Sequence, residues 1–197
     1  RKPAGDPLAV SMPGVKLGDR LLVLGCSDIP LIVALAGKAG SDVLDGGPGW
    51  DTADYSTSPA AVTVNLATGI GLGGDAEADT LMNIERLIGS PFADVLVGDA
   101  GDNAISARAG ADMIFGGAGN DALNGRLGTD TAVYIGNFAA YTITDLGSGR
   151  LRVVANTNSD GTDTLSNFEI LEFADGTFSN GVFTPFGDPT NTAPVAD

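Results

Sequence analysis

A nine-residue pattern rich in glycine and aspartate constrains the fold of this 197-residue chain more than any other feature. The pattern reads G-G-x-G-x-D-x-U-x, where U is a large apolar residue. The unit Gly116–Asn124 matches every fixed position. Two consecutive units run from Gly37 to Asp54. After a break, five further consecutive units run from Gly89 to Val133. Low complexity alone would not hold a run of two units and a run of five in exact nine-residue phase, so the pattern indicates a repeat architecture.

Each unit predicts a tight turn followed by a short strand. Glycine allows φ > 0 and close approach of the backbone, and the D-x-U-x segment alternates as a strand does. Two units would make one coil, and stacked coils would pair as parallel strands about 4.8 Å apart. The predicted fold is all-β, a parallel β-roll solenoid with flanking β-hairpins and a short N-terminal strand-helix cap. Its predicted core is the apolar file Leu44, Leu96, Ile105, Ile114 and Leu123.

A longer duplication is superimposed on the short units. Asp51–Tyr55 is repeated as Asp130–Tyr134, and Asp79–Leu87 is repeated as Asp163–Leu171. Glu85 and Glu169 recur within the second pair of segments, which indicates a repeated structural role and not a catalytic acid pair. The predicted division is an N-terminal β-α cap segment, 1–36; a β-roll, 37–177, with duplicated modules 37–88 and 116–172; and a tail or linker, 178–197.

Position six of each unit carries a carboxylate or an amide. If residues 55–88 loop out of the roll, these side chains are expected to stack along two edges. The first edge would hold Asp42, Asp94, Asp112 and Asp130, and the second would hold Asp51, Asn103 and Asp121.

Carboxylates stacked in this way repel one another. At about 5 Å and an effective dielectric constant of about 20, a like-charged pair costs roughly 3 kcal/mol. Ca²⁺ suits a slot between coils because it takes about six to eight oxygen ligands in a tolerant geometry, whereas Mg²⁺ requires a tighter octahedron. Zinc would need nitrogen or sulfur ligands, but the chain has no His and one Cys. The predicted calcium ligands are the seven position-six residues and the turn glycines Gly46, Gly47, Gly49, Gly98, Gly101, Gly110, Gly116, Gly117, Gly119 and Gly128.

The composition excludes several classes of protein. Ten Lys and Arg stand against 25 Asp and Glu, a net charge of −15, which argues against binding to nucleic acid or anionic lipid. The absence of His removes Ser-His-Asp and Cys-His catalysis, and no catalytic residue is predicted. Cys26 is alone, so no internal disulfide can form. No apolar run is long enough to cross a bilayer, so no membrane insertion is expected.

The repeats resemble the RTX (repeats-in-toxin) family of calcium-binding β-rolls, the hemolysin-type nonapeptide repeats of serralysin-like proteins. The resemblance covers about Gly37 to Thr177. It implies that position-six aspartates and turn carbonyls bind Ca²⁺ between coils. It also implies an extracellular bacterial protein, exported unfolded by type I secretion and folded by external calcium.

Three departures from the family pattern change the expected strength of individual sites. Asn103 replaces Asp, Ala107-Arg108 replaces Gly-Gly, and Ser90-Pro91-Phe92 replaces G-x-G. Sites that touch these residues are expected to be weaker or empty. The best site is expected on the edge that holds Asp112 and Asp130.

The first 36 residues differ in kind from the repeats. Gly18–Asp28 predicts a strand and a glycine turn, and 29–38 predicts a helix with Asp28 as a possible N-cap. This arrangement resembles the first β-α unit of a class I S-adenosylmethionine methyltransferase. Gly-Cys-Ser-Asp stands where that family has D-x-G-x-G, and the remaining strands are missing, so no cofactor site is predicted. The segment is instead expected to cover the end of the roll.

The sequence therefore predicts a non-enzymatic, calcium-binding structural and secretion module, monomeric as a module. Two alternatives share the same roll. One is an adhesin-type interaction module with a glycan or cell-surface partner, and the other is a non-catalytic part of a secreted enzyme.

Overall fold

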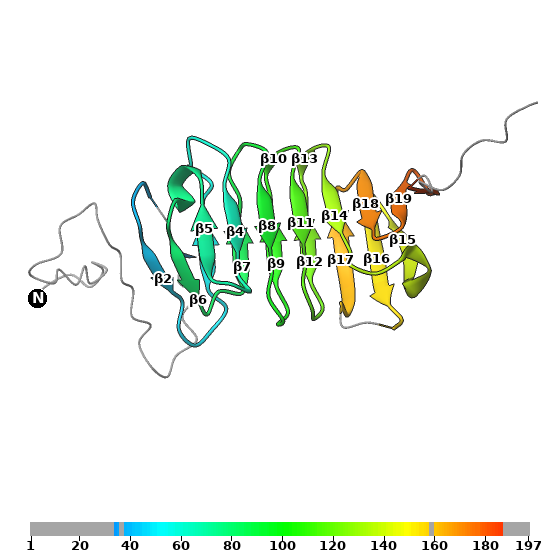
Figure 1. Cartoon of the computed structure of the whole chain (residues 1–197), viewed down its shortest axis with the longest axis horizontal. Helices are drawn as coiled ribbons and strands as arrows, with labels where there is room; N and C mark the ends of the chain where they lie inside the picture. The colour runs from blue at the N-terminus through cyan, green and yellow to red at the C-terminus, as the bar shows by residue number, and fades with distance from the viewer. Residues whose placement is uncertain (1–33, 36–37, 158–159, 187–197) are drawn as a thin grey trace, which may run out of the picture.

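A computed structural model describes residues 34–35, 38–157 and 160–186 of the chain. Within these residues the strands form two facing sheets wound into a β-roll (Figure 1). Sheet A runs, in spatial order, through β1 (Ala34–Leu35), β3 (Thr52–Asp54), β7 (Arg86–Ile88), β9 (Ala104–Ser106), β12 (Ala122–Asn124), β17 (Thr162–Ser166), β16 (Arg150–Ala155) and β15 (Tyr141–Gly147). Sheet B runs through β2 (Val43–Asp45), β6 (Thr80–Met82), β5 (Ile70–Leu72), β4 (Thr63–Asn65), β8 (Val95–Val97), β11 (Met113–Phe115), β14 (Thr131–Val133), β18 (Ile170–Phe173), β19 (Gly176–Ser179) and β20 (Val182–Pro185).

Three short elements complete the described fold. A two-stranded parallel sheet, β10 (Ala109–Gly110) and β13 (Leu127–Gly128), lies along one edge of the roll. Single 3₁₀ turns form at Gly74–Ala76 and Phe138–Ala140. No helix of the described residues is long and apolar enough to span a bilayer. The all-β, parallel β-roll prediction is confirmed.

Most roll strands are three residues long, and their central side chains point between the two sheets. In sheet B, Leu96 pairs with Ile114, which pairs with Ala132 on its other side. In sheet A, Ile105 pairs with Leu123. The predicted core file is buried throughout, because position eight of each unit is the inward position of its strand. The file consists of Leu44, Leu96, Ile105, Ile114 and Leu123.

The expectation that residues 55–88 loop out of the roll is wrong. This segment supplies four strands, β4 to β7. β6 pairs with β2, and β7 lies between β3 and β9. β5 is antiparallel to both β6 and β4, so β4 runs in the same direction as β8 and pairs with it in parallel. The physical reason is that the apolar side chains of this segment are buried in the core, and looping out would expose them to water. They include Val62, Val64, Leu81 and Leu87.

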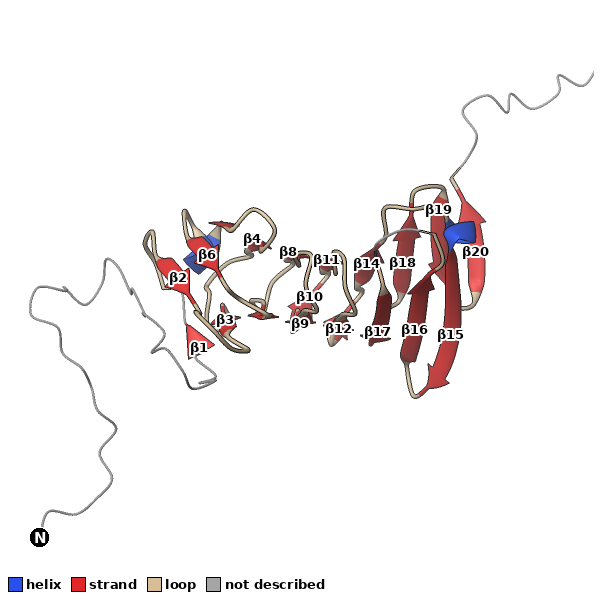
Figure 2. Ribbon diagram, turned by 90° about the horizontal axis from the view of Figure 1, so that it is seen from below, coloured by secondary structure: helices blue, strands red, loops and turns tan. Residues whose placement is uncertain are grey.

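The second duplicated segment builds the same arrangement at the other end of the molecule. The order β12-β17-β16-β15 repeats β2-β6-β5-β4, and β14-β18 repeats β3-β7. Figure 2 shows the longer strands of this second copy beside the narrow coils. Beyond it, β18, β19 and β20 are antiparallel, so the segment expected as a tail from residue 178 begins with sheet structure. Ring contacts tie this end together through Tyr134, Phe138, Tyr141, Phe173, Phe178 and Phe183.

The N-terminal expectation is corrected where the structure describes it. Ala34 and Leu35, inside the predicted helix over 29–38, form β1 and pair in parallel with Thr52 and Ala53. The outer edge of β3 offers these residues ladder hydrogen bonds, which outweigh local helix propensity. Residues 1–33, with the predicted strand, the methyltransferase-like turn and Cys26, lie outside the described residues, as do 36–37.

Candidate calcium sites along the roll edges

The first edge of the roll carries a ladder of main-chain to carboxylate hydrogen bonds. The N–H of Val62 donates to Oδ1 of Asp94 at 2.8 Å, and the N–H of Asp94 donates to Oδ1 of Asp112 at 2.8 Å. The N–H of Asp112 donates to Oδ1 of Asp130 at 3.0 Å, and the N–H of Asp130 donates to Oε2 of Glu169 at 2.8 Å. The predicted stacking of Asp94, Asp112 and Asp130 is therefore confirmed, with Glu169 as the last member.

The second edge carries the same kind of ladder. The N–H of Asn103 donates to Oδ1 of Asp121 at 2.8 Å, and the N–H of Asp121 donates to Oδ1 of Asp163 at 3.0 Å. Each position-six side chain thus caps the backbone of the coil before it. One carboxylate oxygen of each aspartate is used in this way, and the partners of the second oxygen differ from one aspartate to the next.

Asp42 and Asp51 do not stack where the sequence analysis placed them. The N–H of Asp42 donates to Oδ1 of Asp79 at 2.8 Å, and not to Asp94. The N–H of Asp51 donates to Oε2 of Glu85 at 2.8 Å, and not to Asn103. The cause is that β6 pairs with β2 in one sheet and β7 lies next to β9 in the other. Asp79 and Glu85 therefore take the places that were expected for Asp94 and Asn103.

Sequence reasoning missed Asp79 and Asp163 as ladder members. Each also accepts a hydrogen bond from a buried tyrosine: Tyr55 Oη donates to Asp79 Oδ2 at 2.9 Å, and Tyr134 Oη donates to Asp163 Oδ2 at 3.0 Å. The signal was present in the duplication, because the Asp, the Glu and the Tyr recur in both copies. The repeated structural role expected for the two glutamates is confirmed by their equal bonds to position-six N–H groups.

The left-over oxygens divide the aspartates into two groups. Oδ2 of Asp112, Asp121 and Asp130 is buried and has no hydrogen-bond partner. Asp94 differs, because Ser90 donates from its N–H to Oδ2 and from its hydroxyl to Oδ1, each at 2.6 Å. A buried charged oxygen without a partner destabilises the fold, and a bound cation can offset this cost.

Burial dominates the acid–base behaviour of these groups. It raises the pKa of Asp112 to about 7, and the neighbouring charges of Asp94 and Asp130 add to the increase. It also raises the pKa of Asp121 to about 6 and that of Asp163 to about 7. The pKa of Asp130 is raised by burial and by the charge of Glu169. Without a bound cation, ionisation of these carboxylates costs free energy because they are buried and lie close to one another.

The glycine turns bring backbone carbonyl oxygens close to the same edges. Gly117 has φ 100°, and a Cβ there would overlap the carbonyl oxygen of Asp99 in the preceding coil. Gly128 has φ 150°, and a Cβ there would overlap the carbonyl oxygen of Gly110. Only glycine lets the turns stack this closely, so carbonyl oxygens are available beside the buried carboxylates.

These groups suit calcium. Among the described residues no three or more His, Cys, Asp or Glu side chains converge on one point. A cation at the roll edge would therefore take its remaining ligands from main-chain carbonyls. Calcium accepts such an all-oxygen set of mixed origin, whereas zinc requires nitrogen or sulfur.

The fold and its edges define a calcium-binding parallel β-roll. The family model described as the RTX calcium-binding nonapeptide repeat matches the chain in four copies, over residues 34–56, 83–114 and 97–132. These segments belong to the RTX calcium-binding repeat family, and calcium is their cofactor. A search of curated proteins found no match.

Proposed function

We propose that this chain is a structural module of a secreted bacterial protein, and that the module folds when calcium binds between its coils. The observation that carries the proposal is the pair of buried, unpartnered Oδ2 atoms of Asp112 and Asp130 on neighbouring coils. Bound calcium would supply positive charge at this edge and so remove the repulsion between coils. The chain's own residues supply the ladder that positions the carboxylates.

The strongest proposed site uses Asp112 and Asp130 with carbonyls of the two stacked turns that contain Gly110 and Gly128. Stacking of β10 on β13 supports this choice, because it holds these two turns in register. On the opposite edge, Asp121 with the turn of Gly116, Gly117 and Gly119 is the proposed counterpart.

The remaining predicted ligands form weaker proposed sites. Both oxygens of Asp94 are already bonded by protein groups, and Oδ1 of Asn103 accepts the N–H of Asp99 at 2.7 Å. The turn Gly46–Gly49 faces Asp51, whose coil is followed by Glu85 instead of a position-six aspartate. Gly98 and Gly101 belong to the turn that precedes Asn103, and a site there has less negative charge because Asn replaces Asp.

Coupling of calcium binding to folding follows from the thin core. Each three-residue strand of the nine-residue units contributes one inward apolar residue, which is only alanine at Ala53 and Ala132, and 29 glycines raise the conformational entropy that folding must overcome. A metal site that is absent from the unfolded chain adds its binding free energy to folding. Modules 37–88 and 116–172 are proposed to be two copies of one folding unit, because their ladders and tyrosine contacts are equivalent.

Membership of the repeat family supports export, because such proteins are typically secreted by bacteria. A non-catalytic role is proposed because the chain contains no His and, among the described residues, the carboxylates with raised pKa values all belong to the ladders.

Calcium titration of the metal-free chain, followed by far-UV circular dichroism, tests the proposal. We expect strand signal to rise with calcium and to fall again with EGTA, while magnesium at the same concentration fails to substitute. A spectrum that is the same in EGTA and in calcium would overturn the proposal.

A further inference from the structure

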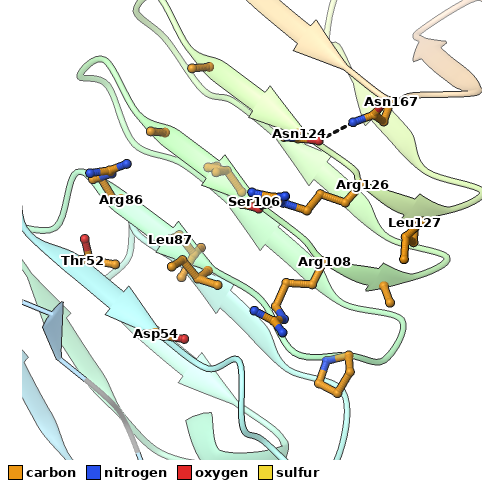
Figure 3. A pocket seen from close by; sticks show the side chains of 16 residues that line it. Thr52, Asp54, Arg86, Leu87, Ser106, Arg108, Asn124, Arg126, Leu127 and Asn167 are labelled. Carbon is orange, nitrogen blue, oxygen red and sulfur yellow. Dashed lines mark hydrogen bonds between the residues drawn. The ribbon is translucent and has the colours of Figure 1, made fainter. Parts of the chain in front are cut away.

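The outer face of sheet A is hollowed into a groove of about 940 Å³ (Figure 3). Its floor consists of small side chains on neighbouring strands, Ala104 and Ser106 of β9 and Ala122 of β12. The turns that carry Ala109 and Leu127 line one side. The small floor residues and these turns make a shallow channel across the coils.

Positive charge is concentrated in this groove. Three of the six Lys and Arg residues that the structure describes line it: Arg86, Arg108 and Arg126. Arg126 Nε donates to Ser106 Oγ at 2.8 Å, and within the described part of the chain no carboxylate forms an ion pair with any of the three. Asp54 is the one carboxylate among the groove's lining residues, so three arginines and one aspartate leave the groove positive in a chain of net charge −15.

Two of these arginines occupy backbone positions that favour glycine. Arg108 has φ 85° and Arg126 has φ 73°, both at the second position of the turn, where Gly117 has φ 100° in the unit between them. Left-handed backbone costs a bulky residue free energy that glycine does not lose, and such outliers point to function. The N–H of Leu127 donates to the carbonyl of Arg108 at 2.9 Å, so the two arginines are side by side on successive coils. The fold thus places two arginines at strained positions of stacked turns.

We propose that the groove binds a segment of an acidic polysaccharide, with carboxylates of successive sugar residues on the arginines. A guanidinium group is planar and matches a carboxylate in a bidentate manner. The cations are spread over neighbouring coils, from β7 to the turn after β12, so they fit an extended chain with spaced charges. Ser106 and Asn124, which line the same groove, can bond sugar hydroxyls.

Charge complementarity favours a thin polymer over other polyanions. The groove lies beside the calcium edges of a strongly acidic protein. A membrane surface or a nucleic acid duplex would bring its charge against those acidic edges as well as against the groove. A single polysaccharide chain can lie within the channel and avoid them.

Binding of short oligogalacturonates to the calcium-loaded chain, measured by isothermal titration calorimetry, tests this proposal. Arg108→Gly and Arg126→Gly restore the glycine of the repeat, so each should leave the circular dichroism unchanged and the melting temperature equal or higher. Each should nevertheless lower affinity roughly tenfold or more, as loss of a charge-assisted hydrogen bond does. The matched control is Arg150→Gln with Arg152→Gln, which removes two positive charges from exposed positions on β16.

The proposal requires that the control variant bind as the wild type does and that the neutral galactose oligomer not bind. Absence of oligogalacturonate binding by folded, calcium-loaded protein would overturn it. So would equal losses in the control and groove variants, because the attraction would then be general charge. Binding to anionic vesicles in preference to the oligomer would also overturn it.

Discussion

The main-chain N–H of Asp112 donates to Oδ1 of Asp130 at 3.0 Å, while Oδ2 of each carboxylate is buried without a hydrogen-bond partner. One oxygen of each side chain therefore builds the roll, and the other remains for a ligand. This division assigns the ladder and the proposed calcium site to the same residues.

Replacement of one position-six aspartate should separate these functions. Asp112→Asn keeps an acceptor for the N–H of Asp94 but replaces the free oxygen by an amide nitrogen, which cannot bind calcium. We expect the calcium concentration at half-maximal folding to rise about tenfold or more. Asp145→Asn is the control, since it makes the same exchange at an exposed carboxylate of β15 and keeps an acceptor for the N–H of Gly147, and should change the midpoint much less. Equal shifts in the two variants would contradict the assignment of the stronger site.

Stability should depend on pH with opposite signs in the absence and presence of calcium. Burial raises the pKa of Asp112 and Asp163 to about 7 and that of Asp121 to about 6, above the unfolded value of about 3.9. The calcium-free fold therefore binds more protons than the unfolded chain does, and its stability falls as pH rises through about 6 to 7.

Protons and calcium compete for the same oxygens, so calcium affinity should fall as pH is lowered through that window. The strand signal that remains in EGTA, followed by circular dichroism, and calcium titrations, both at about pH 5 and about pH 8, measure the two trends. A calcium-free chain that becomes more stable between those pH values as pH rises would count against the raised carboxylate pKa values.

The glutamate of the duplicated segment should act as an acceptor and not as an acid. Glu169 Oε2 accepts the N–H of Asp130, so Glu169→Ala leaves a buried donor without a partner and should destabilise the calcium-loaded fold by about 1–3 kcal/mol. Glu169→Gln keeps an acceptor oxygen and should cost less. Urea unfolding in saturating calcium compares the variants, and a larger loss for Gln than for Ala would disprove the role.

Close stacking of the turns should be visible in glycine substitutions. Gly117→Ala introduces a Cβ against the carbonyl oxygen of Asp99 at φ 100°, so we expect a loss of more than about 3 kcal/mol or no folding. Gly147→Ala, at φ 79° with no heavy atom within 4 Å of the new Cβ, carries backbone strain alone and should cost about 1 kcal/mol. Thermal unfolding in calcium measures both, and similar losses would show that the turns can separate.

Periodicity was sufficient to predict the roll, its inward residues and the stacking of Asp94, Asp112 and Asp130. Each follows from a fixed nine-residue phase, in which a residue's place in the coil depends only on its place in the unit. The same reasoning failed for Asp42 and Asp51. Their partners come from a segment without the repeat pattern, and its place in the ladder depends on long-range strand pairing.

The arginine groove was also beyond sequence reasoning. Arg108 was recognised as a departure from Gly-Gly, but its alignment with Arg126 and Arg86 needs the register of sheet A and the two turns. The unpartnered Oδ2 atoms could not be predicted either, because they depend on which carboxylate oxygen accepts each main-chain N–H.

Anomalous X-ray diffraction from crystals of the chain grown in calcium tests the central claim most directly. Calcium peaks about 2.3–2.6 Å from Oδ2 of Asp112 or Asp130, between neighbouring coils, are the predicted result. A well-ordered roll whose carboxylates at residues 112 and 130 contact only water, and which stays equally ordered after EGTA treatment, would contradict it.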